Sequence, residues 1–229
     1  MKKRIGILHA HYSNIAYIEE ALTGCDVELL HFVDPGLVYR VGSDESFSEE
    51  QAAEKVNRQV EWIAACHVDI ILITCTNYIA LLQEDQLAFK VPPIVKIDEP
   101  FFEKIISLEE PQILLFTNPA TVEGTMNRLC QYAKANGKSP QIEARIIGDA
   151  FQLVMQGKKE QTHRIMTDYI RTLLESESGK ANAVSVAQLS MVGAARAITA
   201  EYGFSVQDPL APLAAHLRTL LQHDTDEAL

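Results

Sequence analysis

A cysteine stands where a buried apolar segment of this sequence gives way to a helix-like one. The run from Asp69 to Leu82 reads DIILITCTNYIALL, so Cys75 lies in a polar hinge, Thr74 to Asn77, with apolar residues on both sides. This pattern predicts a parallel strand that runs into a helix. Cys75 would then lie at the carboxyl end of the strand, where the first N–H groups of the helix lower the pKa of a thiol. A thiolate in that place is a nucleophile or a base, whereas an isolated cysteine at a strand end is more often a small buried hydrophobe.

Other polar side chains follow the ends of other predicted strands. His9 and His11 are two positions apart on one predicted strand face, so either is a candidate for a second base. No third ligand accompanies this pair, so we predict no metal site. Asp98 and Glu99 are candidates for a base or for binding a substrate ammonium group, or else form a charged helix start. The candidate substrate-binding donors, several of which also suit helix caps, are Asn14, Thr76, Asn77, Thr117, Thr121, Gln188 and Ser190.

Composition restricts the class of protein. The 229 residues carry 20 Lys and Arg against 31 Asp and Glu, a net charge of -11, and no run of basic residues. This balance opposes binding to a phosphate backbone, so we exclude a nucleic-acid partner. The first residues hold only a strand-length apolar run, which predicts neither a signal peptide nor a membrane span. The four cysteines lack CxxC spacing, which favours reduced thiols and a cytoplasmic protein.

The predicted elements alternate between strands and helices, which predicts an α/β fold. The segment 34–45 is rich in turn formers and charges, so we expect a loop there and regard it as a candidate lid. We also expect a solvated loop at 175–179. The predicted strands are 4–10, 27–33, 69–74, 93–97, 112–116, 142–147 and 183–187. The predicted helices are 14–22, 48–66, 76–82, 100–107, 119–136, 149–156, 159–174, 191–202 and 209–222.

The two halves of the chain repeat one arrangement. The strand, polar loop and helix at 5–22 match those at 113–129, and the strand, hinge and helix at 69–82 match those at 183–198. Gln188 therefore stands where the first half has Cys75. This predicts two pseudo-symmetric lobes, residues 1–98 plus 206–229 and residues 99–205, each a mainly parallel sheet flanked by helices, with the active site in the cleft between the lobes. A single doubly wound sheet would also repeat strand and helix.

Four phrases of the sequence resemble the aspartate/glutamate racemase superfamily. They are ILITCTNY around Cys75, VKIDEP ending at Pro100, TNPAT from Thr117 and AQLSM ending at Met191. The resemblance implies two α/β lobes and chemistry without a cofactor. In the racemases of that superfamily two cysteines remove and return the α-proton of the substrate. The resemblance implies that Cys75 matches the first of them, whereas the position of the second holds Gln188. An amide cannot exchange a proton near neutral pH, so symmetrical two-thiol racemisation is not available.

The sequence therefore predicts a cofactor-independent racemase or isomerase of a small carboxylic or amino acid, with Cys75 as base or nucleophile. A decarboxylase of the arylmalonate type is the first alternative, and a non-catalytic carboxylate-binding protein is the second. The expected partner is a small carboxylate, with no nucleic acid and no membrane, and self-association is left open. We further expect Cys75 to be the only reactive thiol, because Cys66 and Cys130 are predicted to lie on packed helix faces.

Overall fold

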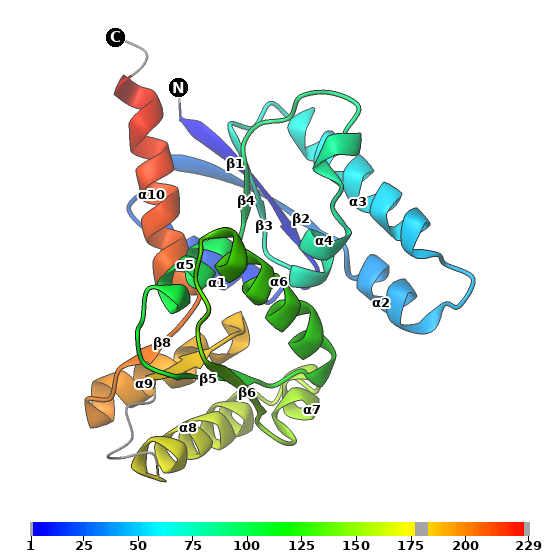
Figure 1. Ribbon diagram of the computed structural model, residues 1–229. Helices are drawn as coiled ribbons and strands as arrows, with labels where there is room; N and C mark the ends of the chain where they lie inside the picture. The colour runs from blue at the N-terminus through cyan, green and yellow to red at the C-terminus, as the bar shows by residue number, and fades with distance from the viewer. Residues whose placement is uncertain (1, 177–182, 227–229) are drawn as a thin grey trace. The chain divides into compact units, whose positions relative to one another are not determined.

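The computed structural model describes residues 2–176 and 183–226 (Figure 1). The chain divides into two compact units: residues 1–99 with 213–229, and residues 100–212. Each unit contains one four-stranded sheet in which all neighbouring strands are parallel. The strand orders are β2-β1-β3-β4 and β6-β5-β7-β8, so the two units repeat one connectivity.

The first unit is organised around β1 and β3, whose residues are almost all buried. Gly6 in β1 and Ile63 in α3 lie so close that there is no room for a Cβ on the glycine, which lets the helix approach the sheet. The strands are β1 (Lys3–His9), β2 (Val27–Val33), β3 (Ile70–Ile73) and β4 (Ile94–Lys96). The helices are α1 (Asn14–Ala21), α2 (Pro35–Ser43), α3 (Glu49–Ala64), α4 (Thr76–Leu81) and the 3₁₀ helix η1 (Glu84–Gln86).

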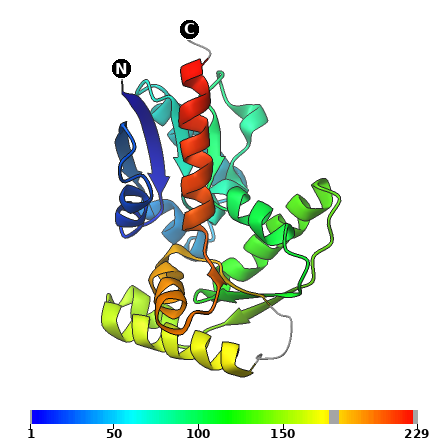
Figure 2. The same cartoon turned by 90° about the vertical axis from the view of Figure 1, so that its left-hand side faces the viewer.

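The second unit buries β5 on both of its faces. Ile113 and Leu115 pack into one apolar cluster with α8 and α9, whereas Leu114 and Phe116 pack into another with α5 and α6. Figure 2 shows α8 and α9, in yellow-green and orange, lying side by side. The strands are β5 (Gln112–Phe116), β6 (Ile142–Ile146), β7 (Ala183–Val186) and β8 (Val206–Gln207). The helices are α5 (Glu99–Ile106), η2 (Pro119–Thr121), α6 (Val122–Ala135), α7 (Ala150–Met155), α8 (Lys159–Ser176), η3 (Leu189–Met191) and α9 (Val192–Tyr202).

The last helix, α10 (Leu210–Asp226), belongs to the first unit from Leu213 onward. Leu213 and Leu217 are fully buried, and Arg218 donates to the carbonyl oxygen of Ala21 at the end of α1. None of the described helices is long and apolar enough to cross a membrane.

The structure corrects two of the predicted loops. The segment predicted as a lid contains α2: the Asp34 side chain accepts from the N–H of Gly36 and caps a helix whose first residue is Pro35. The residues that were interpreted as turn formers, Asp34 and Pro35, instead begin a helix, because Asp is favoured at the cap and Pro at the first helical position. Of the predicted loop 175–179, the first two residues end α8, and the other three lie outside the described residues. The two-residue strand β8 was not predicted.

Candidate functional site

Cys75 is the second residue after the fully buried strand β3 and precedes the first residue of α4. Its backbone is extended, and its carbonyl oxygen accepts from the N–H of Ile79, which begins the helix. The preceding residue, Thr74, still pairs with β1 through its N–H and the carbonyl oxygen of Leu8 at 3.0 Å. The parallel pairing of β1 with β3 therefore fixes the position of the cysteine.

The environment of Cys75 favours a neutral thiol. Burial raises the pKa of the thiol, and the negative charge of the nearby Asp98 adds to this effect. The backbone N–H groups of Tyr78 and Asn77 hydrogen-bond to the sulfur and oppose the rise without reversing it. The expectation of a lowered pKa is therefore wrong: the short helix supplies N–H donors, but the loss of solvation outweighs them. At neutral pH the group is placed to donate a proton, and it needs help to become a thiolate.

The buried His9 contacts the residue that precedes the cysteine, and the half-buried His31 contacts His9. His9 Nδ1 is 2.9 Å from Thr74 Oγ1, and His9 Nε2 is 2.9 Å from Nδ1 of His31 in β2. The Thr74 hydroxyl donates to the carbonyl oxygen of Leu8 at 3.2 Å, so it must accept from His9. His9 thus carries its proton on Nδ1, and Nε2 accepts from His31. Burial and the neighbouring His31 lower the pKa of His9 to about 4.

The predicted pairing of His9 with His11 on one strand face is wrong. Strand β1 ends at His9, and His11 lies in the exposed loop that follows. His11 Nδ1 accepts from the backbone N–H of Ser13 and contacts the Ser13 hydroxyl at 2.8 Å. Residues two positions apart lie on the same face only within a strand. Because the strand ends at His9, the two-residue spacing does not place His11 on the face of His9.

Of the predicted donors in the first unit, three lie near the cysteine in the chain or in space. The side-chain N–H of Asn14 is 3.5 Å from Thr74 Oγ1, so Asn14 reaches the same hydroxyl as His9. Thr76 and Asn77 follow Cys75 directly, and both are half-buried. Backbone and side-chain donors therefore gather at the carboxyl end of β3 within the first unit.

The second unit brings two other predicted residues, Thr117 and Thr121, into contact with Gln188. The Gln188 Oε1 atom accepts from the N–H and the hydroxyl of Thr117, both at 2.7 Å, and from the N–H of Asn118 at 3.2 Å. Its Nε2 donates to the hydroxyl of Thr121 at 3.2 Å. Ser190, in η3, is half-buried and makes no hydrogen bond with this group among the described residues. Sequence reasoning named Thr117, Thr121 and Gln188 but did not foresee that they bind one another.

The other cysteines differ from the predicted picture. Cys130 is exposed on α6, and Cys66 lies just after the end of α3, where its thiol donates to the carbonyl oxygen of Trp62. The prediction that both occupy packed helix faces is therefore wrong. Cys25 and Cys75 are half-buried.

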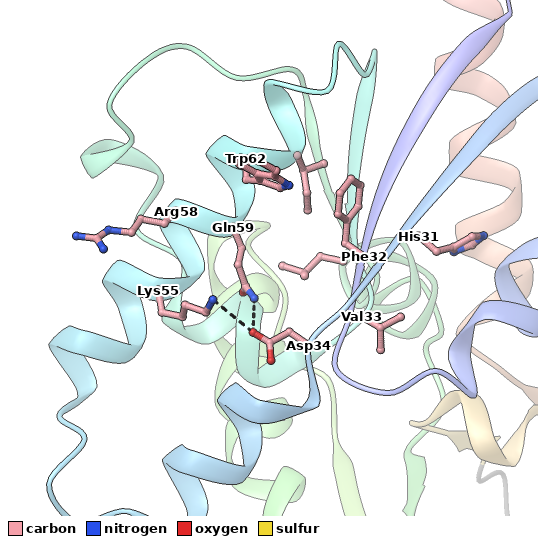
Figure 3. A pocket seen from close by; sticks show the side chains of 10 residues that line it. His31, Phe32, Val33, Asp34, Lys55, Arg58, Gln59 and Trp62 are labelled. Atoms are coloured by element: carbon pink, nitrogen blue, oxygen red, sulfur yellow. Dashed lines mark hydrogen bonds and ion pairs between the residues drawn. The ribbon is translucent and has the colours of Figure 1, made fainter.

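A groove on the first unit was missed by the sequence reasoning. It has a volume of about 600 Å³ and lies between β2 and α3 (Figure 3), where the Asp34 carboxylate accepts from Gln59 and lies 3.7 Å from the Lys55 ammonium. Trp62, 69% exposed, stands at its side. None of the predicted site residues lines this groove, so we do not assign it to the candidate site.

Solved structures with a similar fold include racemases and a decarboxylase. The chain is similar to an aspartate racemase from Picrophilus torridus, with a TM-score of 0.68 and 16% identity over 96% of this chain and 94% of that one. It is also similar to an allantoin racemase from Klebsiella pneumoniae (TM-score 0.62, 18% identity, 96% and 88% covered). A variant of arylmalonate decarboxylase gives a TM-score of 0.57 at 12% identity (95% and 92% covered).

These similarities establish the fold. The chain shares its two-unit α/β fold with these racemases and with arylmalonate decarboxylase over almost its whole length. No protein-family model matches the chain, and no curated protein matches it in sequence. At sequence identities below 20%, these similarities support the fold but not the activity, which must be argued from the site.

Proposed function

We propose that this protein is a cofactor-independent racemase or isomerase of a small carboxylic or amino acid, in which Cys75 transfers the proton or forms a covalent adduct. The observation that carries the proposal is the place of the half-buried Cys75, between the end of β3 and the first residue of α4. The shared fold supports it, because the similar structures include racemases.

The proposed substrate contacts in the first unit are Asn14, Thr76 and Asn77. Their hydroxyl, amide and N–H groups suit a carboxylate, whose charge increases when a proton leaves the neighbouring carbon and an enolate-like intermediate forms. In the second unit the proposed contacts are Thr117, Thr121, Gln188 and Ser190. His9 enters as a positioning residue: both of its ring nitrogens are hydrogen-bonded, and it holds Thr74 next to the cysteine.

The proposed reaction uses one thiol. Cys75 first gives its proton to water, and the thiolate then accepts the α-proton while the electron pair of the broken C–H bond moves onto the substrate carboxylate. The same thiol then returns that proton to the same face of the carbon, which gives exchange without inversion. Gln188 offers only hydrogen bonds, so inversion needs another proton donor on the opposite face, whereas isomerisation would instead use a covalent adduct of the sulfur.

Decarboxylation of a substituted malonate is the second candidate, and the raised pKa of Cys75 favours it. In that reaction a carbon–carbon bond breaks, carbon dioxide leaves, and the electron pair remains on carbon until a proton donor quenches it. A thiol that is neutral at rest can supply that proton with no prior ionisation. Racemisation instead begins with the thiolate.

The deciding experiment is incubation in heavy water with D- and L-amino acids, hydantoins, maleate and substituted malonates. Deuterium at a substrate carbon, followed by NMR, supports proton transfer, and loss of carbon dioxide selects the decarboxylase. Cys75→Ser should reduce the rate by about 10²–10⁴-fold, which is the usual contribution of a positioned acid or base. Cys130→Ser is the matched control and should keep full activity. Binding of a carboxylate without exchange or turnover in the whole panel would instead select the non-catalytic binder.

A further inference from the structure

Strand β2 is the longest edge strand of the two described sheets. The edge strands β4 and β8 are short, with three and two residues, and β6 carries the ion pair of Glu143 with Arg145 at 2.7 Å. Strand β2 has seven residues, no proline and one charged residue, Glu28, which is paired with Arg4 of β1. Short or charged edges keep a sheet from pairing with another chain, and most of β2 lacks both protections.

The outer edge of β2 presents backbone groups that can still pair. The N–H of Asp34, the residue after β2, donates to the carbonyl oxygen of His9 in β1 at 2.9 Å. Alternate residues of a strand direct their backbone groups to opposite sides, so the N–H and carbonyl groups of Leu29, His31 and Val33 point away from β1. Within the described part of the chain these outward groups have no hydrogen-bond partner. They form a template on which a further strand can pair.

One face of β2 is also uncovered. Helix α3 packs mainly against β1 and β3, and the groove described above lies between α3 and β2 (Figure 3). Phe32 of β2 and Trp62 of α3 line this groove, and Val33 at the end of β2 is 40% exposed. None of the residues of β2 is fully buried, whereas five of the seven residues of β1 are. The outer edge of β2 and this groove together form a continuous surface, which we call the β2 surface.

The charges at the β2 surface are balanced. Lys55 and Arg58 of α3 both line the groove, and each is paired with a carboxylate: Lys55 with Asp34 at 3.7 Å, and Arg58 with Glu54. A surface whose charges are already paired does not select a strongly acidic or a strongly basic partner. It is compatible with a copy of itself, because two balanced surfaces approach without strong repulsion even though the whole chain has a net charge of -11.

We propose that the β2 surface is the interface of a homodimer, in which β2 pairs antiparallel with β2 of a second copy. A twofold axis perpendicular to the sheet runs the two identical strands antiparallel, and it joins the two sheets into one continuous sheet with no open β2 edge. A register centred on His31 pairs Leu29 of one copy with Val33 of the other, so all the outward backbone groups find partners. The two grooves meet over the joined strands, where Phe32 and Trp62 of both copies exclude water. This dimer does not depend on the proposed reaction.

The test measures self-association and the environment of Trp62 together. Trp62 is the only tryptophan of the chain, so the tryptophan fluorescence reports on the β2 surface alone. Sedimentation velocity between about 1 μM and about 100 μM should show a monomer that converts into a dimer, and the emission of Trp62 should shift to shorter wavelength over the same range. Val33→Lys should raise the dissociation constant of the dimer at least about tenfold, because a lysine on an edge strand opposes pairing. Ile146→Lys, at a 45% exposed position on the edge strand β6, is the matched control and should leave the constant unchanged.

Hydrogen exchange of the wild type tests the pairing without any variant. In the dimer the N–H groups of Leu29, His31 and Val33 should exchange at least about tenfold more slowly than in the dilute monomer. Those of Leu30 and Phe32, which point to β1, should exchange equally slowly in both. A chain that stays monomeric over the whole concentration range would overturn the proposal. So would a dimer whose outward N–H groups exchange as fast as in the monomer, or one that the two lysine variants weaken equally.

Discussion

Cys75 and Gln188 occupy equivalent places in the two sheets. Each is the second residue after the end of its strand, β3 and β7, each precedes a short helix, and each has a backbone φ of -127°. Their surroundings differ. The Cys75 sulfur accepts two backbone N–H groups of its own helix, whereas the Gln188 oxygen accepts donors from the turn after β5. The repeated backbone thus presents a group that can exchange protons in one unit and a group that cannot in the other.

The first prediction concerns the order in which the thiols react. Cys130 is exposed, whereas burial raises the pKa of Cys75 and keeps its thiolate scarce at neutral pH. We therefore expect iodoacetamide to modify Cys130 before Cys75 at pH 7, and the rate at Cys75 to keep rising above pH 9. Mass spectrometry of the digested protein gives the order.

The matched control for this prediction is Cys130→Ser. In this variant the early modification should vanish, while the pH profile at Cys75 should not change. Rapid alkylation of Cys75 at pH 7 would show that its thiolate is stabilised, which contradicts the pKa direction given above.

The second prediction concerns stability in acid. The pKa of His9 is about 4 in the folded chain and near 6.5 when unfolded, so between these values the unfolded chain binds the extra proton. The free energy of unfolding should therefore be at its full value above pH 6.5 and fall as the pH decreases towards 4. The loss from this group is about 3 kcal/mol. Urea unfolding at a series of pH values measures it.

His9→Gln should flatten this pH dependence, since the variant has no ring to protonate. The remaining slope should contain a part from His31, whose pKa is also lowered by burial. His163→Gln, at an exposed position on α8, is the control and should retain the slope of the wild type. An unchanged slope in His9→Gln would mean that His9 does not titrate as described.

The third prediction compares two glycines. A Cβ at Gly6 would lie 2.3 Å from a methyl carbon of the buried Ile63, so Gly6→Ala should force α3 away from the sheet and destabilise the protein by about 1–3 kcal/mol. Gly124, in α6, has no atom near the place of a Cβ. Gly124→Ala should therefore stabilise the helix by up to about 1 kcal/mol. Unfolding in urea distinguishes the two, and equal effects would contradict the packing of β1 against α3.

Much of the fold was accessible from the sequence because its strands are continuous apolar runs bounded by polar hinges. Strand β5 has the predicted bounds, 112–116, since charged and turn-forming residues lie on both sides of it. Helix α2 was missed because Asp34, Pro35 and Gly36 suit both a turn and a helix start, and only the bond from the Gly36 N–H to Asp34 distinguishes them. Strand β8 was missed because a two-residue strand is too short to show the alternation of apolar and polar residues that identifies a strand in a sequence.

The candidate site was less accessible, because its contacts join distant strands. His9 and His31 are 22 positions apart, and their contact depends on the register of β1 with β2, in which Ile7 pairs with His31. That register places His31 diagonal to His9 on the same face of the sheet. The sequence could identify Gln188 as unable to exchange a proton, but not the donors that hold its amide. The active site predicted between the two lobes stays a prediction.

The last prediction returns to Gln188. Gln188→Cys places a thiol two residues beyond β7, the position that Cys75 has beyond β3, and leaves Thr117 and Asn118 with free N–H groups that would stabilise a thiolate. If the two positions act on one substrate, this variant should begin or increase exchange of the α-proton with inversion, which a single thiol does not provide. Chiral chromatography together with NMR in heavy water measures both.

Two variants serve as controls for this prediction. Gln207→Cys adds a thiol elsewhere in the unit and should show no increase in exchange or inversion. The double variant Cys75→Ser with Gln188→Cys should lose the increase seen in Gln188→Cys. If the Gln188→Cys protein folds and binds substrate but does not invert it, then Cys75 and Gln188 are equivalent in backbone position only, and the prediction is wrong.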